Sequence, residues 1–220
     1  MLHKLMRAGA AIGCVLMLLG VALAAVDVDR MLQTLVARFG APAEGLFQAW
    51  RDMQREARER PEREQLLRVN DFFDRRLQFR DDQLVWGQAD YWATPLEFLG
   101  KGAGDCEDFA LAKYFSLVEL GVSPQRLRLI YVRARLPGVA EPVAHMVLGY
   151  YERPDAEPLV LDNLQAVILP ASQRPDLAPV FSFNAEGVWM GAAARPGAPV
   201  DRLSRWRDLM LKMQREGHLP

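Results

Sequence analysis

The N-terminal half of the chain carries apolar residues at helical spacing. Before residue 78 they recur every three to four positions, which is the period of an amphipathic helix. The segments with this pattern are residues 28–39, 43–58 and 66–77. A dense run of mixed charges over residues 51–68 is typical of a solvated helix face. The sequence therefore predicts a group of N-terminal helices, followed by an irregular segment over residues 79–94.

Two further helices are predicted on either side of a glycine-containing turn. Residues 94–97 read Thr-Pro-Leu-Glu, which matches a capping box with proline at the first helical position, so a short helix should follow and end at Gly100. Residues 101–104 contain two glycines and are expected to form a flexible turn. The apolar pattern is helical again from Cys106, and Gly121 suits the end of that helix.

The C-terminal half changes to short strand patterns. Runs rich in Val, Ile, Leu and Tyr alternate with Gly and Pro, which is typical of strands joined by tight turns. These runs are residues 127–134, 144–151, 159–162, 180–183 and 188–190. Helical spacing returns over residues 201–216. Helices followed by a mostly antiparallel sheet predict an α+β domain.

The first residues have the pattern of an export signal. A lysine and an arginine precede an almost wholly apolar stretch, residues 8–24, which ends in Ala-Leu-Ala. A charged start, an apolar stretch and a small-residue exit are the three parts of a secretory signal. The alternative is a retained membrane anchor, but the stretch is slightly short for a span of about 20 residues. We expect residues 1–24 to be a cleaved signal peptide, residues 25–220 to form one domain, and the mature protein to be periplasmic.

Charge, cysteine and histidine content narrow the function further. The chain has a formal net charge of -1 and no basic excess, so nothing indicates nucleic acid as a partner. Cys14 lies in the expected signal, which leaves Cys106 unpaired; in an exported protein this suggests an intermolecular disulfide or a reactive thiol. His3 also lies in the signal. His218 is close to the C-terminus, where chains usually fray, so His145 is the expected catalytic histidine.

The residues of an acyl-transfer triad follow one another along the chain. Cys106 is expected at a helix N-terminus, where backbone N–H groups and the helix dipole lower the pKa of a thiol and stabilise an oxyanion. His145 lies in one predicted strand and Asp162 ends the next, so the two can meet across antiparallel neighbours. Asp162 would fix the imidazole tautomer while the other ring nitrogen faces the thiol. Singly, the cysteine and the histidine suit ordinary core positions, but together they favour catalysis.

The residues around this triad resemble a known family. The blocks that carry the resemblance are residues 104–110 (Gly-Asp-Cys-Glu-Asp-Phe-Ala), 144–148 (Ala-His-Met-Val-Leu) and 161–163 (Leu-Asp-Asn), with flanking Trp92 and residues 95–98. Over about residues 30 to 190 the chain resembles the bacterial transglutaminase-like cysteine proteases, in particular their periplasmic, adhesin-cleaving members. The resemblance implies a papain-like transglutaminase core, in which the catalytic cysteine lies on a helix packed against an antiparallel sheet that bears the histidine and aspartate.

The acids beside the cysteine point to a cation. Asp105 can cap the helix, and acids suit a first helical turn. Three carboxylates next to Cys106 should nevertheless raise the pKa of its thiol unless a cation offsets them, and oxygen ligands of this kind suit Ca²⁺. The resemblance implies a Ca²⁺ site beside the nucleophile that maps to Asp105 and Glu107, and Asp108 is close enough in sequence to contribute.

The resemblance also implies a substrate and a regulator. The expected function is an endopeptidase that cuts the N-terminal, periplasmic region of a large surface adhesin at a small-residue site, releasing it and promoting biofilm dispersal. An inner-membrane receptor for cyclic di-GMP would sequester the protease. Two alternatives stay open. A transglutaminase or acyltransferase uses the same triad order, with an amine instead of water resolving the thioester. A non-catalytic peptide-binding module would keep the fold without requiring all three groups.

Overall fold

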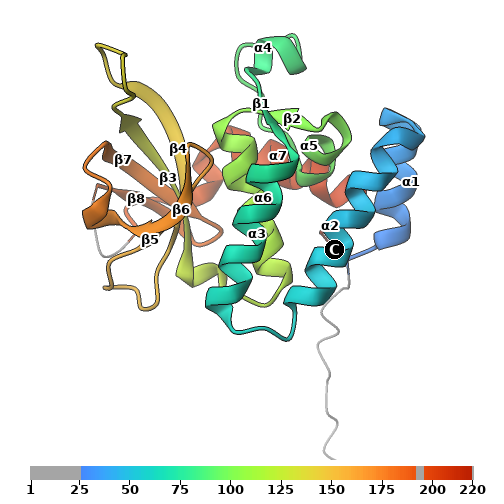
Figure 1. Ribbon diagram of the computed structural model, residues 1–220, viewed down its shortest axis with the longest axis horizontal. Coiled ribbons are helices and arrows are strands. Elements are labelled where there is room, and N and C mark those ends of the chain that lie inside the picture. The colour runs from blue at the N-terminus through green and yellow to red at the C-terminus, as the bar shows by residue number, and fades with distance from the viewer. Residues whose placement is uncertain (1–25, 192–195, 220) are drawn as a thin grey trace, which may run out of the picture.

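The computed structural model describes residues 26–191 and 196–219, so the expected signal peptide, residues 1–24, lies outside the described residues. The helices pack on one face of a six-stranded antiparallel sheet, which confirms the predicted α+β class (Figure 1). Within the described ranges, no helix has both the length and the apolar character needed to cross a membrane.

Helix α4 (Asp82–Val85) lies in the segment predicted to be irregular, and the other α-helices lie where the sequence predicted them, with shifts at their ends. Pro42 lies in a short 3₁₀ turn that precedes the second helix instead of starting it. The α-helices are α1 Val28–Phe39, α2 Glu44–Ala57, α3 Glu62–Arg76, α4 Asp82–Val85, α5 Pro95–Lys101, α6 Cys106–Glu119 and α7 Ser204–Glu216. The 3₁₀ turns are η1 Ala41–Ala43, η2 Pro124–Arg126, η3 Ala171–Gln173 and η4 Val200–Arg202.

The predicted capping box starts α5. Thr94 Oγ1 accepts a hydrogen bond from the Glu97 backbone N–H at 3.0 Å, and the Glu97 carboxylate accepts one from the Thr94 N–H at 3.0 Å. The helix runs one residue past the predicted end at Gly100. Gly102, at φ 65°, takes the left-handed cap position that a residue without Cβ adopts most readily.

The turn between α5 and α6 is ordered, so the prediction of a flexible segment over residues 101–104 was wrong. Strand β2, Ala103–Gly104, pairs in parallel with β1, Gln78–Phe79. The Gly102 carbonyl accepts a hydrogen bond from the Gln78 N–H at 3.0 Å. This pairing joins segments that are far apart in sequence, and it fixes the backbone immediately before Cys106.

The large sheet has the strand order β6-β5-β4-β3-β7-β8, and each neighbouring pair is antiparallel. Its strands are β3 Leu127–Ala134, β4 Val143–Tyr150, β5 Leu159–Asp162, β6 Gln165–Pro170, β7 Leu177–Asn184 and β8 Gly187–Met190. Strand β6 was not predicted. It lies at an edge and ends in Pro170, and its residue Val167 is 59% exposed, so it lacks the apolar run of a central strand.

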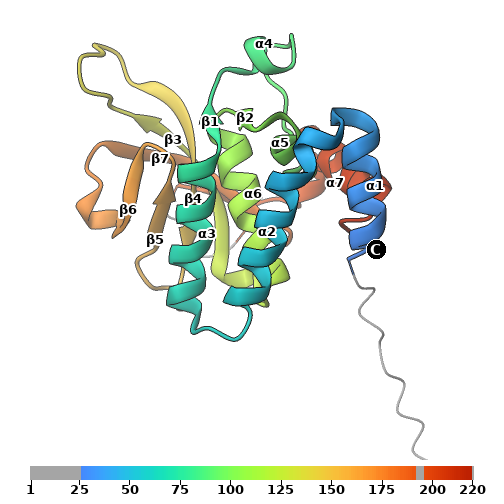
Figure 2. The ribbon, with the colours of Figure 1, turned by 45° about the vertical axis from the view of Figure 1, so that its right-hand side comes forward.

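Helix α6 is buried on all sides because it lies between the other helices and the sheet. It contacts α3 and α5 on one side and strands β3, β4 and β5 on the other. Figure 2 shows α6 beside α3, with the sheet across from them. Ten consecutive residues of α6, positions 108–117, are buried, as expected of a helix inside a core. The N-terminus of α6 is therefore held rigidly against the sheet.

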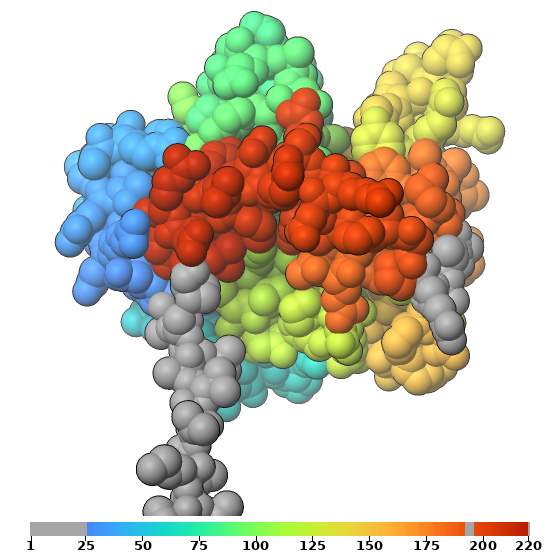
Figure 3. Space-filling view, turned by 180° about the vertical axis from the view of Figure 1, so that it is seen from behind, coloured from blue at the N-terminus to red at the C-terminus, as the bar shows by residue number. Residues whose placement is uncertain are grey.

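The two ends of the described chain lie together, and His218 is buried there. Helices α1 and α7 are side by side, and the Asp27 N–H donates to the Gly217 carbonyl at 2.9 Å (Figure 3). The expectation that His218 frays was wrong: its ring packs against Trp50, and its Nε2 lies 2.8 Å from a Glu119 oxygen. Glu119 ends α6, about 20 Å from Cys106 at 1.5 Å per residue, so His218 does not reach the thiol.

Candidate active site

A cleft of about 610 Å³ lies at the end of the molecule where α6 begins. Both Cys106 and His145 line it. Residues of the segment around α4 contribute to one wall, and residues of β3 and β4 contribute to the other. The α4 segment and the β3–β4 hairpin project at the same end of the molecule (Figure 2). The volume is in the range of ligand sites in proteins.

Cys106 is the first residue of α6 and is half-buried. Gly104 allows the close approach of the preceding backbone, because a Cβ there would collide with the Asp108 carboxylate and the Phe98 ring. The first N–H groups of a helix have no partners within it, so those at the start of α6 are available to an oxyanion beside Cys106. The structure thus places the thiol where the sequence predicted.

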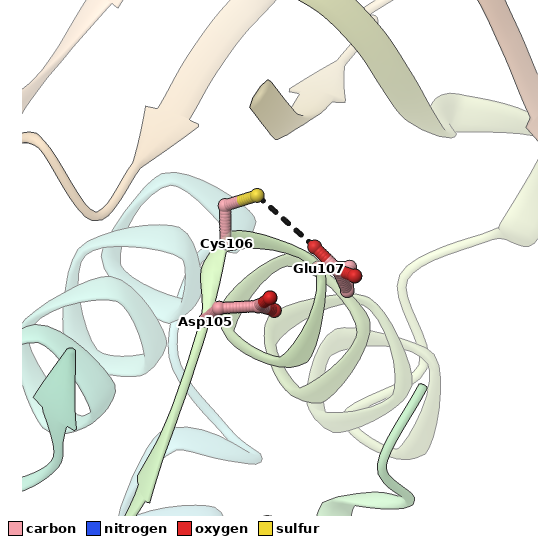
Figure 4. A group of neighbouring side chains, drawn as sticks. All are labelled: Asp105, Cys106 and Glu107. Atoms are coloured by element: carbon pink, nitrogen blue, oxygen red, sulfur yellow. Dashed lines mark hydrogen bonds between the residues drawn. The ribbon is translucent and has the colours of Figure 1, made fainter. Parts of the chain in front are cut away.

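The Cys106 thiol is hydrogen-bonded to a neighbouring acid. Cys106 Sγ donates a hydrogen bond to Glu107 Oε2 at 3.1 Å (Figure 4). Burial raises the pKa of the thiol, and the charge and hydrogen bond of Glu107 and the charge of Asp105 raise it further. A hydrogen bond with the Met146 backbone acts in the opposite direction. The lowering expected from the helix N-terminus is therefore outweighed by the flanking acids, as the alternative argument from like charges predicted.

His145 and Asp162 form the predicted pair. His145 Nε2 lies 2.8 Å from Asp162 Oδ1, and both residues are buried. Leu148 of β4 is paired with Leu161 of β5, so Asp162 lies opposite residue 147 and reaches His145 two positions further along the same face. The contact between neighbouring strands is confirmed, with a diagonal geometry. Since Nε2 is directed to Asp162, Nδ1 is the ring nitrogen left for the thiol.

Arg174 completes the surroundings of Asp162, and the sequence analysis missed it. Its Nη2 donates to Asp162 Oδ2 at 2.7 Å, while the Leu164 N–H donates to Oδ1 at 3.0 Å. Burial by itself would raise the pKa of Asp162, but the hydrogen bond and charge of His145, together with those two donors, lower it to about 2. Arg174 follows η3, in a segment with no catalytic motif, so nothing in the sequence indicated it.

Cys106 and His145 of the predicted triad line one cleft, but they are not joined by a direct hydrogen bond. Within the described ranges, the thiol of Cys106 bonds to Glu107 and not to His145. Catalytic hydrogen bonds are often long in a free enzyme and tighten when substrate binds. The nucleophile and the base therefore line one cleft, each held by a different carboxylate.

Five acids gather around the start of α6: Asp82, Asp90, Asp105, Glu107 and Asp108. One group of three, Asp82, Asp105 and Asp108, offers oxygens that all lie within 4.8 Å of one another. Each of these three residues has a buried oxygen without a hydrogen-bond partner in the described part of the chain. Burial, followed by repulsion from neighbouring acids, raises the pKa of Asp82 to about 6 and raises those of Asp105 and Asp108 as well.

This donor set suits a hard cation. Carboxylate oxygens with no partner and raised pKa values are the chemistry that Ca²⁺ satisfies in proteins. Asp105, Glu107 and Asp108 were expected near such a site, and Figure 4 shows the Asp105 and Glu107 side chains beside Cys106. Asp82 was not expected. Asp82 is the first residue of α4, which lies in the segment predicted to be irregular. The sequence around it has no spacing typical of metal ligands.

Aromatic rings line the cleft on the sheet side. Tyr131 of β3 stacks on Phe181 of β7 with ring centroids 5.3 Å apart, and both line the cleft together with Trp92. Flat apolar walls of this kind, beside the backbone of β4, suit an extended peptide more than a compact charged ligand.

Comparison with known proteins agrees with this geometry. Residues 46–177 match the family model of the bacterial transglutaminase-like cysteine proteinases. Among solved structures, the chain is similar to LapG from Legionella pneumophila. The EGTA-treated form is 38% identical with a TM-score of 0.73, over 84% of this chain and 97% of that one. The calcium-bound form is 40% identical with a TM-score of 0.70, over 84% and 98%.

A search of curated protein sequences gives no match. The family model nevertheless covers more than half of the chain, and the structural relatives are matched over almost their whole length. The resemblance noted in the sequence, the α+β transglutaminase-like fold and the assignment as a cysteine protease are all confirmed. This chain belongs to the bacterial transglutaminase-like cysteine proteinase family.

Proposed function

We propose that this protein is a calcium-dependent cysteine endopeptidase in which Cys106 is the nucleophile, His145 the general base and acid, and Asp162 the orienting acid. The observation that carries the proposal is the position of the buried His145–Asp162 pair in the same cleft as a thiol at a helix N-terminus. A pure binding module has no need of a carboxylate that fixes the tautomer of a cleft histidine.

In the proposed mechanism the acyl group of the substrate is transferred to water. His145 Nδ1 takes the proton of Cys106, and the thiolate attacks the peptide carbonyl carbon to form a tetrahedral oxyanion. Backbone N–H groups at the start of α6 stabilise that oxyanion. His145 then gives its proton to the leaving amine as the C–N bond breaks, which leaves a thioester on Cys106. Finally His145 takes a proton from water, the resulting hydroxide attacks the thioester, and the thiol is regenerated with release of the new carboxyl terminus.

Calcium belongs to this proposal because the residues beside Cys106 fit it. In the described part of the chain, Asp82, Asp105 and Asp108 have buried oxygens without partners, and Glu107 accepts the hydrogen bond of the Cys106 thiol. These four residues would hold the ion. When bound, Ca²⁺ supplies positive charge that lowers the pKa of the neighbouring thiol. A relative with 40% identity has a calcium-bound structure, which supports Ca²⁺ as the ion here.

The proposed substrate is the N-terminal, periplasmic region of a large surface adhesin. Its cleavage would release the adhesin and promote biofilm dispersal, and an inner-membrane receptor for cyclic di-GMP would control access by sequestering the protease. The signal-like residues 1–24, the family resemblance and an open cleft with aromatic walls support this proposal. A periplasmic location further predicts that N-terminal sequencing of protein from the periplasmic fraction begins near residue 25.

The test is cleavage of a purified adhesin fragment. The protein is incubated with the N-terminal segment of the large repeat adhesin of its own genome, and the products are identified by mass spectrometry. We expect one cut with Ca²⁺ present and none with Cys106→Ala, whose fold is checked by circular dichroism. Undiminished cleavage by Cys106→Ala would end the thiol mechanism.

A second arm separates hydrolysis from amine transfer. The protein is given the same fragment, or a glutamine peptide, together with a labelled primary amine. A hydrolase yields a free carboxyl terminus at the cut and no incorporated label. Label in the product would assign the triad to a transglutaminase or acyltransferase instead.

A further inference from the structure

A second cavity, of about 490 Å³, lies on the other face of the sheet from α6. The helices cover only the opposite face (Figure 1). The cavity shares no lining residue with the catalytic cleft. Its floor is an apolar cluster separate from the main core, formed by Ile130, Val132, Val147 and Val160. The fold therefore has an apolar hollow that the proposed proteolysis does not use.

Arg128 of β3 lines this cavity with a buried guanidinium, only 7% exposed. Its Cζ lies 4.5 Å from the Tyr151 ring centroid and 4.3 Å from the Trp189 ring centroid, so it is held between two aromatic faces. Within the described ranges no carboxylate pairs with it, and its Nε has no hydrogen-bond partner. A buried cation without an anion is unfavourable, and aromatic faces offset only part of that cost.

Arg174 is the second arginine of the cavity wall, and it is equally buried. Its Nη2 binds Asp162 and Asp176, each at 2.7 Å. Its Nη1 is buried and has no partner in the described part of the chain. One guanidinium thus lines the second cavity and also holds the carboxylate that orients His145.

We propose that this cavity binds a small amphiphile with a carboxylate head and an apolar tail, of the class of a medium-chain fatty acid. The head supplies the anion that Arg128 lacks, and the tail covers the four aliphatic side chains of the floor. The volume is that of a small-molecule site. Two acids of the rim, Asp155 and Glu157, are exposed to solvent, so their repulsion of an anion is screened.

This site goes beyond the proposed function, and its occupancy is measurable without proteolysis. Arg174, which holds Asp162, also lines this cavity.

The experiment is calorimetric titration of the protein with decanoate, below its micelle-forming concentration. We expect saturable binding that Arg128→Gln weakens about thirtyfold or more, since removing one member of a buried charge pair has effects of this size. Arg133→Gln is the matched control. It makes the same charge change on the same strand, but that side chain is exposed and alternates to the other face. Acetate, which lacks the tail, and decyltrimethylammonium, which carries the opposite charge, should not bind.

A photoreactive decanoate with a diazirine in its tail keeps the test decisive if Arg128→Gln fails to fold. We expect its adducts in the unaltered protein to map to β3, β4 and β5 at the cavity floor, and excess decanoate to prevent them. Absence of saturable binding, equal binding by the Arg128→Gln and Arg133→Gln variants, or adducts confined to the catalytic cleft would each overturn the proposal.

Discussion

Two groups of buried carboxylates lie near the same cleft, and their surroundings are opposite. Asp162 receives hydrogen bonds on both oxygens, from His145 and the Leu164 N–H on one and from Arg174 on the other. Its pKa is lowered to about 2 even though burial acts to raise it. Asp105 and Asp108 each keep a buried oxygen without a partner in the described part of the chain, and burial raises the pKa of both.

This difference distinguishes a carboxylate whose partners all come from the polypeptide from carboxylates that would need a cation as a partner. A buried carboxylate stays ionised only where donors or positive charges compensate its lost hydration. The fold supplies these to Asp162, so the base half of the proposed triad, the His145–Asp162 pair, is preformed. Around Cys106, Asp82 and Asp108 each accept one backbone hydrogen bond, but they and Asp105 keep buried oxygens without a partner in the described part of the chain. We therefore expect the nucleophile half, Cys106 with these acids, to depend on an ion. Our predictions test this division, beginning with the largest expected effect.

Removing the base half should abolish most activity. His145→Ala should reduce kcat/KM for the adhesin fragment by about 10⁴-fold, because His145 is the only imidazole that lines the described cleft. Asp162→Asn should cost less, about 10³-fold, since the imidazole remains but its orienting charge is lost. Initial cleavage rates at equal folded concentration measure both. If Asp162→Asn proves harmless, Asn163 becomes the candidate for the orienting residue.

Removing the cation should affect the nucleophile half and spare the base half. EGTA should lower activity by about 100-fold or more, because each unit by which the pKa of the thiol rises reduces the thiolate tenfold. Ca²⁺ should restore activity and Mg²⁺ should not, since carboxylate ligands in a loop suit the larger ion.

Asp105→Asn and Glu107→Gln should each weaken calorimetric Ca²⁺ binding and lose activity together. Asp176→Asn, an acid on the base half, is the matched control for Ca²⁺ binding and should leave it unchanged. Full activity in excess EGTA, without heat on adding Ca²⁺, would reduce the acids of α6 to helix-capping residues.

Arg174→Gln should have an intermediate effect, about 10- to 100-fold on kcat with little change in KM, because it positions Asp162 without lining the catalytic cleft. The acid limb of the pH–rate profile should move as well, since the charge near the imidazole changes. Arg126→Gln is a suitable control. It breaks a comparable ion pair, at 2.6 Å with Glu62, away from the cleft. Equal effects of the two variants would contradict a role for Arg174 in positioning the pair.

The smallest effect concerns stability and pH. The folded-state pKa of Asp162 is lowered from 3.8 to about 2, so it contributes about 2 kcal/mol that is present above pH 4 and lost as pH falls toward 2. Asp82 is the reverse case. Its folded pKa is raised to about 6, so the metal-free protein loses stability as pH rises from about 4 to about 6.

We expect bound Ca²⁺ to offset the stability that is lost through the raised pKa values of these acids. The rise of Tm on adding Ca²⁺ should therefore be larger at about pH 7.5 than at about pH 5, where protons compete for the same oxygens. Thermal unfolding with Ca²⁺ and with EGTA at both values measures it. A rise of Tm that is the same at both pH values would mean that the ion does not bind to these acids.

The sequence predicted most of the helices, the central strands and the contact between His145 and Asp162, because each has a local signature. The apolar period marks α1 and α6, and the capping box marks the start of α5. A cysteine after a glycine-containing turn, with acids on both sides, is also visible without any knowledge of the fold.

What the sequence missed depends on contacts between distant segments. The β1–β2 pair, the approach of Asp82 to α6 and the bond from Arg174 to Asp162 each join residues brought together only by folding. His218 was misjudged for the same reason, because position along the chain suggested fraying while packing against Trp50 buries it. Local patterns carry no information about such partners.

The central claim is that the nucleophile depends on a cation while the base does not. Its most direct test is the rate of alkylation of Cys106 by iodoacetamide as a function of pH, in Ca²⁺ and in EGTA, with Cys106→Ala to subtract any other labelling. We predict that Ca²⁺ moves the alkylation curve to lower pH, so that the thiol reacts readily near neutrality, and that EGTA moves it to higher pH. Two superimposed curves would contradict the account.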